Sequence, residues 1–258
     1  MILEPAISFN VYSIFIAVTL LMLLGFEAGY RIGNLGSRNN KLDFDSMLSP
    51  IVTGLLRMLA FVLAFAFAMA VSNQNDRNKY VLDEANAINT AYLQTNFIAP
   101  QKGDEIKVLL KEYVDIRLLV VKAEKRQFAL DRSLEIHQLL WARVDSLVKS
   151  NPTSPSFLLA ESINTIINMH EKRMSAGLYV RIQSSIWMAL FMISILTMLT
   201  VGIQASTIGH RCFIIFIPLC LAYSVLVTLV IDLDRPQSGL ITVGQQSMET
   251  LQHKLNQY

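Results

Sequence analysis

The amino-acid sequence predicts an all-α membrane protein, and three observations support that prediction. Only 16% of the 258 residues are charged, against about 25% in soluble domains, and the mean hydropathy is +0.42. The apolar residues gather in four runs, each close to the roughly 20 residues that a helix needs to cross a bilayer. Between the second and third runs, apolar residues recur at three- and four-residue spacing, which is typical of helices that bury one face.

The four apolar runs are the predicted transmembrane helices. They cover residues 9–29, 49–72, 184–205 and 212–231. The first run follows Glu4 and has neither a basic leader nor a small-residue cleavage site, so we expect a retained anchor rather than a signal peptide. A short polar segment joins the third and fourth runs, which predicts a helical hairpin.

The polar region at 73–181 is predicted to be an antiparallel helical bundle outside the membrane. Proline, glycine and serine interrupt its apolar stripes at 98–104 and 150–156. Strand-like alternation is absent from this sequence. No clear break separates the bundle from the second and third apolar runs, so we expect its first and last helices to continue those spans. Gly177 is the weakest point of that expectation.

These patterns divide the chain into four parts. Residues 1–72 contain the first two spans and their basic connection, and residues 73–181 form the helical domain. Residues 182–232 form the second transmembrane hairpin. Residues 233–258 form a charged corner followed by an amphipathic tail.

Basic residues in the short connections predict the orientation in the membrane. Arg31, Arg38 and Lys41 lie between the first two runs, and Arg211 lies between the last two, whereas the N-terminal tail has no basic residue. Short cytoplasmic loops carry an excess of Lys and Arg. We therefore expect a multi-pass plasma-membrane protein with both termini and the helical domain on the outer side.

Several function classes lack support in the sequence. The net charge of +2, without a basic stripe interleaved with aromatics, argues against nucleic-acid binding. Phosphate-binding, dinucleotide-binding and serine-nucleophile motifs are absent from the sequence. Metal-ligand spacing is not shown by any of His137, His170, His210 and His253. We therefore expect no enzyme activity, no metal site and no cofactor.

Two polar stretches follow the second and fourth apolar runs, and they supply the main candidate site. They would leave the membrane at the same level in a four-span topology. One interpretation is a pore mouth, where acids repeated around an axis would select cations. The other is a structural clamp that ties the fourth span to the base of the helical domain, because charges at a half-dry interface persist best when paired. The candidate residues are Asp83, Glu84, Asn86, Asp232, Asp234 and Arg235.

Arg57 lies inside the second apolar run, where a cation is energetically expensive and often functional. It also lies about two helical turns from the polar start of that run, so its side chain could snorkel to the headgroups. Glu27, near the end of the first run, is on the same side and is a candidate partner. An anion or pairing site and a snorkelling residue are both open interpretations.

The second apolar run also carries alanine at four-residue spacing, at Ala60, Ala64 and Ala68. Small residues on one face let helices approach closely in lipid. The functional alternative is that this thin-walled face lines a path between subunits.

Four segments of the chain are distinctive in combination. They are "LAFAFAMAVSNQNDR" (63–77), "DEANAINTAYLQTNFIAP" (83–100), "KEYVDIRL" (111–118) and "VIDLDRPQSGLITVGQQSM" (230–248). Together they resemble the bestrophin-like family of bacterial membrane proteins, a domain of unknown function, over about 15–255. The resemblance implies a four-span helical protein of the bacterial inner membrane. The family name suggests kinship with bestrophin anion channels, although the bestrophin signature itself is not evident in this sequence.

Two functional hypotheses follow. The first is an oligomeric ion channel or ion-conducting pore in the lipid bilayer, through which small inorganic ions pass. Four spans alone cannot enclose a water-filled path, so this hypothesis requires a homo-oligomer with several copies around an axis. The acids favour cations, whereas the family name favours anions. The second hypothesis is a non-conducting, membrane-anchored interaction or envelope-sensing module.

Overall fold

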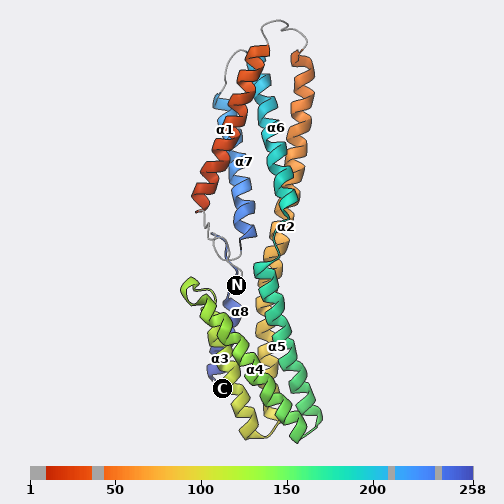
Figure 1. The fold of residues 1–258 in the computed structure, drawn as a ribbon, viewed down its shortest axis with the longest axis vertical. Coiled ribbons are helices and arrows are strands. Elements are labelled where there is room, and N and C mark those ends of the chain that lie inside the picture. The colour runs from red at the N-terminus through yellow and green to blue at the C-terminus, as the bar shows by residue number, and fades with distance from the viewer. Residues whose placement is uncertain (1–9, 37–43, 209–212, 236–239, 258) are drawn as a thin grey trace. The chain divides into compact units, whose positions relative to one another are not determined.

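The structure is a computed structural model that describes residues 10–36, 44–208, 213–235 and 240–257 (Figure 1). Every regular element in these ranges is a helix, so the predicted all-α class is confirmed. Two short 3₁₀ helices, Thr95–Phe97 and Ala123–Lys125, connect longer elements. The α-helices described are α1 (Val11–Gly36), α2 (Phe44–Gln94), α3 (Pro100–Leu119), α4 (Arg126–Ser150), α5 (Ser154–Leu178), α6 (Ser184–Ile208), α7 (Phe213–Asp234) and α8 (Gln246–Gln257).

The chain divides into two compact units. The membrane unit comprises Met1–Gln74 and Arg181–Thr242, and the polar unit comprises Asn75–Val180 and Val243–Tyr258. Helix α2 contributes its apolar first part to the membrane unit and its polar second part to the polar unit. The C-terminal tail likewise contributes residues to both units.

Four of the described helices, α1, α2, α6 and α7, are long and apolar enough to cross a membrane. The four apolar runs of the sequence fall on these helices, so four potential spans are confirmed by length and hydropathy. In the membrane unit, α1 packs beside α6 and α7 (Figure 1). Buried side chains of the three helices, including Met22, Leu190 and Val227, share one apolar core.

Glycines allow α1 and α6 to approach closely. Gly29 of α1 faces the backbone of α6, and a Cβ added there would lie 2.0 Å from the carbonyl oxygen of Leu199. Gly202 of α6 faces the backbone of α1, and a Cβ there would lie 2.1 Å from the carbonyl oxygen of Phe26. Neither position has room for a side chain, so the close contact requires glycine on both helices. Small residues at helix contacts serve the same purpose in other membrane proteins.

Within the described ranges, the alanine face of α2 takes no part in such a contact. Ala60, Ala64 and Ala68 are all exposed, whereas Ala66 and Ala70 are fully buried on the opposite side of the helix. The close approach therefore uses the glycines of α1 and α6, and the face that the sequence singled out points away from the membrane unit's core.

Helix α2 is continuous over 51 residues, which confirms that the first helix of the polar region extends the second span. The matching expectation for α5 and α6 is wrong. Helix α5 ends at Leu178, directly after Gly177, and α6 begins at Ser184. Glycine costs about 1 kcal/mol in a helix relative to alanine, which favours an end at this place.

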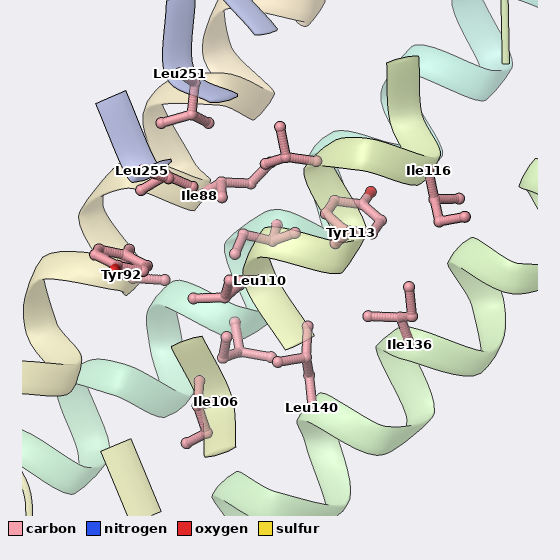
Figure 2. Close-up of a cluster of buried hydrophobic side chains, with 14 of the residues drawn as sticks. Ile88, Tyr92, Ile106, Leu110, Tyr113, Ile116, Ile136, Leu140, Leu251 and Leu255 are labelled. Carbon is pink, nitrogen blue, oxygen red and sulfur yellow. The ribbon is translucent and has the colours of Figure 1, made fainter. Parts of the chain in front are cut away.

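The polar unit has its own apolar core, to which α2, α3, α4, α5 and α8 all contribute (Figure 2). Ile88, Leu110 and Leu140 are fully buried there, and the ring of Tyr113 lies among them. Each fully buried side chain of this kind is worth about 1.5–3 kcal/mol relative to an exposed one. The core therefore fixes the polar side chains that the same helices carry.

Helix α8 packs its apolar stripe against this core. Met248, Leu251 and Leu255 recur at three- and four-residue steps and are all buried. Just before the helix, the Gly244 N–H donates to Asn78 Oδ1 of α2 over 3.2 Å. The amphipathic tail thus belongs to the core of the polar unit.

Candidate functional site

The polar unit encloses a group of buried charged and aromatic side chains that we call the Glu84 cluster. Tyr113 and Arg117 are one helical turn apart on α3, and His170 and Arg173 are one turn apart on α5, so each pair lies on one face of its helix. The members come from four helices: Glu84 from α2, Tyr113 and Arg117 from α3, His137 from α4, and His170 and Arg173 from α5.

Glu84 is at the centre of the cluster, and its side chain is completely buried. Its Oε1 accepts a hydrogen bond from the Tyr113 hydroxyl at 2.6 Å, and its Oε2 accepts one from Arg173 Nη1 at 2.6 Å. Arg117 approaches from α3, with Nε 3.0 Å from Oε1 and Nη2 donating to Oε2 at 3.4 Å. One carboxylate therefore ion-pairs with two guanidinium groups inside a protein core.

The neighbours of Glu84 keep it ionised. Burial alone would raise the pKa of its carboxyl group, but Arg117, Arg173 and the Tyr113 hydroxyl outweigh burial and lower that pKa to about 2. Arg173 has a lowered pKa because it is buried and close to Arg117, yet a guanidinium stays protonated at any physiological pH. The cluster is thus a charged Arg–Glu–Arg triad at neutral pH.

The two histidines of the cluster are neutral at neutral pH. Burial lowers the pKa of His137 to about 4, with Arg117 adding to the effect and Glu84 opposing it. Burial, followed by the charge of Arg117, lowers the pKa of His170 to about 3. Because Tyr113 donates its proton to Glu84, its oxygen accepts from His170 Nδ1 at 3.2 Å, which assigns the Nδ1–H tautomer to His170.

Three buried side-chain nitrogens of the cluster have no hydrogen-bond partner in the described structure, and one of them, Arg117 Nε, still ion-pairs with Glu84. The other two, Nη1 of Arg117, whose side chain is 1% exposed, and Nε2 of His137, have no contact with an acceptor. Buried polar atoms are rarely left without a partner, so such atoms often mark a bound water or ion.

Asp232, one of the predicted site residues, binds backbone near the end of α7. Its carboxylate accepts the N–H of Leu240 at 2.9 Å and that of Ile241 at 3.0 Å. Its carbonyl oxygen accepts the N–H of Arg235. Asp232 therefore holds the chain that returns after the end of α7.

Asp234 connects the end of α7 to the residues that precede α6. Its Oδ1 accepts the N–H of Ile182 at 2.9 Å, and its carbonyl oxygen accepts from Arg181 Nη1 at 2.8 Å. Both contacts lie within the membrane unit. Asp232 and Asp234 thus form hydrogen bonds that hold backbone segments together near the end of α7 and the start of α6.

The predicted residues on α2 do not lie together. Glu84 faces the core, Asp83 is half-buried, and Asn86 is exposed. Asn86 borders a groove of about 410 Å³ between α2 and α8 in the polar unit. The groove is lined by Leu82, Ala85, Asn86, Asn89, Gln246, Ser247, Thr250, Leu251 and Lys254.

The two charges predicted inside the apolar runs differ in exposure, and Glu27 on α1 is half-buried. Arg57 is exposed on α2. Glu27, which the sequence suggested as its partner, accepts a hydrogen bond from Arg31 at 2.8 Å, one turn further along α1. Among the residues described, His, Cys, Asp and Glu side chains form no group of three that could hold a metal ion.

A comparison with protein-family models identifies the family of this chain. Residues 14–248 match the family model described as Bestrophin-like domain. The chain belongs to the bestrophin-like family. No curated protein and no solved structure matches it. The family match confirms the resemblance seen in the sequence, and together with the four apolar helices it identifies a multi-pass membrane protein.

Most of the Glu84 cluster escaped the sequence analysis of this bestrophin-like chain. A signal was nevertheless present, because each member is a polar residue on an apolar helical stripe. Glu84 shares its face with the buried Val81 and Ile88, and Arg117 shares its face with the buried Leu110 and Val114. Helical phase could therefore have identified these side chains as buried, but it could not have paired them across four helices.

Proposed function

We propose that this bestrophin-like protein is one subunit of an oligomeric ion channel in the bacterial inner membrane. The observation that carries the proposal is the exposed small-residue face of α2 in the membrane unit. Ala60, Ala64 and Ala68 are uncovered, although α2 is apolar enough to span a membrane. Lipid can solvate such a face, but a face of small residues is suited to close contact with another helix.

The second part of α2 supports the same proposal. In the polar unit this helix exposes Asn75, Lys79, Asn86 and Thr90 rather than burying them. Assembled around an axis, copies of α2 would bring small residues together within the membrane and polar residues together beyond it. That arrangement provides a wetted entrance and a narrow path, which a single four-span chain cannot enclose.

The proposal leaves the ion to be measured. Acids near a pore entrance favour cations, and kinship with bestrophins favours anions. We propose no enzymatic step, and the proposed orientation puts both termini and the polar unit on the outer side of the membrane. Asp232 and Asp234 serve primarily to hold the backbone through the hydrogen bonds described above.

Reconstitution tests the proposed function. The purified protein in liposomes with a potassium chloride gradient should give ion flux, and its reversal potential identifies the permeant ion. Ala64→Phe adds bulk to the proposed subunit contact and should abolish both flux and the oligomer seen by size-exclusion chromatography with light scattering.

A control introduces the same ring at another exposed position. Leu24→Phe adds a ring on α1 at a side chain that is 67% exposed, and flux and assembly should both persist. Wild-type protein that carries no current under any salt or voltage would contradict the proposal. Equal effects of Ala64→Phe and Leu24→Phe would remove the role given to the alanine face.

The groove between α2 and α8 supports a second candidate function, a non-conducting envelope-sensing module. Its lining combines amide and hydroxyl groups with Lys254, which suits a polar partner segment. Under this hypothesis, Asn86→Leu in the groove should abolish a stable complex with an envelope protein. Flux without any such complex would favour the channel instead.

A further inference from the structure

The Glu84 cluster holds more positive than negative charge. Glu84 contributes one negative charge, whereas Arg117 and Arg173 each contribute one positive charge. The histidines add no charge at neutral pH because burial lowers the pKa of both. One positive charge is therefore unbalanced in a place that is largely removed from water, and uncompensated buried charge is strongly unfavourable.

The geometry shows where the excess charge is concentrated. Arg173 directs its Nη1 to Glu84 and its Nη2 to Gln245 at 2.7 Å, so both ends of its guanidinium are bound. Arg117 contacts Glu84 through Nε and Nη2 but leaves Nη1 buried without a partner. The free donor thus belongs to the more deeply buried of the two cations.

A second donor is available in the same cluster. The ring of His137 lies 5.0 Å from that of Tyr113 and 4.7 Å from that of His170, measured between centroids. Its Nε2 is buried and has no partner, and in the Nε2–H tautomer it donates a hydrogen bond. The unpartnered Nη1 of a guanidinium and an unpartnered ring N–H are the kinds of hydrogen-bond donor that bind a small anion.

We propose that the Glu84 cluster binds one small inorganic anion of the halide class, held by Arg117 Nη1 and His137 Nε2. Arg117 is 1% exposed, so a bound anion loses its water, and this desolvation costs more for the multiply charged phosphate and sulfate than for a halide. The ion neutralises the triad and satisfies both buried donors. This site lies in the polar unit and does not rest on the proposed channel activity.

The test is chloride-dependent stability of the full-length protein in detergent. Sodium gluconate replaces sodium chloride so that sodium concentration and ionic strength stay fixed. A bound ligand stabilises the folded state by mass action, so the thermal midpoint should rise with chloride, and each tenfold increase above the dissociation constant should add the same increment. Equal midpoints in chloride and gluconate would overturn the proposal.

Charge variants separate this site from other chloride effects. Arg173→Met removes the excess positive charge and should raise the half-saturating chloride concentration about tenfold or more, whereas Glu84→Gln adds to the excess and should lower it. Arg132→Met is the matched control, because Arg132 pairs with Glu112 at the surface. It makes the same charge change outside the cluster and should leave the value unchanged. Equal shifts in Arg173→Met and Arg132→Met would refute the site.

A direct measurement covers the case in which a variant does not fold. Crystals of the wild-type protein grown in bromide should give an anomalous peak within hydrogen-bond distance of Arg117 Nη1. A cluster without such a peak, in crystals that show bromide elsewhere, would rule out halide binding at this place.

Discussion

Single residues of the Glu84 cluster show how position in the fold changes what a side chain does. Glu84 and Asp83 are adjacent in sequence, yet one is buried against two arginines and the other is half-exposed on α2. Buried ion pairs often contribute little net stability, because desolvation offsets their attraction, but removal of one partner costs about 3–5 kcal/mol. The cluster therefore makes the packing of α2, α3 and α5 specific, because any shift would leave a buried charge unpaired.

The histidines of the cluster predict that the polar unit loses stability in acid. The pKa values of His137 and His170 are lowered to about 4 and about 3, so the unfolded chain binds protons below pH 6.5 while the folded chain does not. Stability should therefore be fully present above pH 6.5 and fall as the pH drops, by about 1.4 kcal/mol per pH unit for each histidine. Below pH 4.5, Glu84 acts in the same direction, because its pKa is lowered to about 2.

Urea titrations of the detergent-solubilised protein between pH 7.5 and 4.5 measure this slope. His137→Phe keeps a ring against Tyr113 and should reduce the slope by about half, since one of two titrating groups is lost. His253→Asn, at an exposed position of α8, is the control and should leave the slope unchanged. A stability that stays constant or rises toward pH 4.5 would show that the two rings are not buried as neutral groups.

At the scale of elements, sequence periodicity anticipated helices far better than contacts between them. The four spans and the long α2 follow from apolar length and from the absence of a break near 72. The end of α5 after Gly177 was missed because a single glycine only weakens a helix, and the surrounding packing decides. The contact of α1 with α6 was missed for a different reason. A glycine in a transmembrane helix indicates that another atom packs close to its Cα. The sequence does not show that this atom belongs to the backbone of a helix far away in the chain.

The close α1–α6 contact predicts opposite outcomes for two glycine-to-alanine substitutions. Gly29→Ala places a Cβ 2.0 Å from a backbone oxygen of α6, so the helices must separate, and we expect a loss of about 1–3 kcal/mol. Gly54→Ala has no atom within 4 Å of its Cβ and should be neutral or stabilising by up to about 1 kcal/mol. Thermal midpoints of the two variants in the same detergent test this. A Gly29→Ala protein as stable as Gly54→Ala would mean that α1 and α6 do not approach as described.

At the scale of the whole molecule, the two units have separate apolar cores. Every member of the core around Leu110 belongs to the polar unit, and every member of the cores around Met22 and Phe26 belongs to the membrane unit. The Arg–Glu–Arg triad lies in the polar unit and the α1–α6 glycine contact lies in the membrane unit, so each stabilises its own unit.

Separate cores predict that damage to one unit is not transmitted to the other. Leu110→Ala removes a fully buried side chain and should cost the polar unit about 2–5 kcal/mol, whereas Gly29→Ala acts in the membrane unit. Hydrogen–deuterium exchange of the full-length protein should then show faster exchange in α3 and unchanged exchange in α6 for Leu110→Ala, with the reverse for Gly29→Ala. The double variant should show the two effects added, because sites without shared partners are additive within about 0.5 kcal/mol. Faster exchange in α6 caused by Leu110→Ala alone would mean that the continuous helix α2 couples the two cores into one cooperative structure.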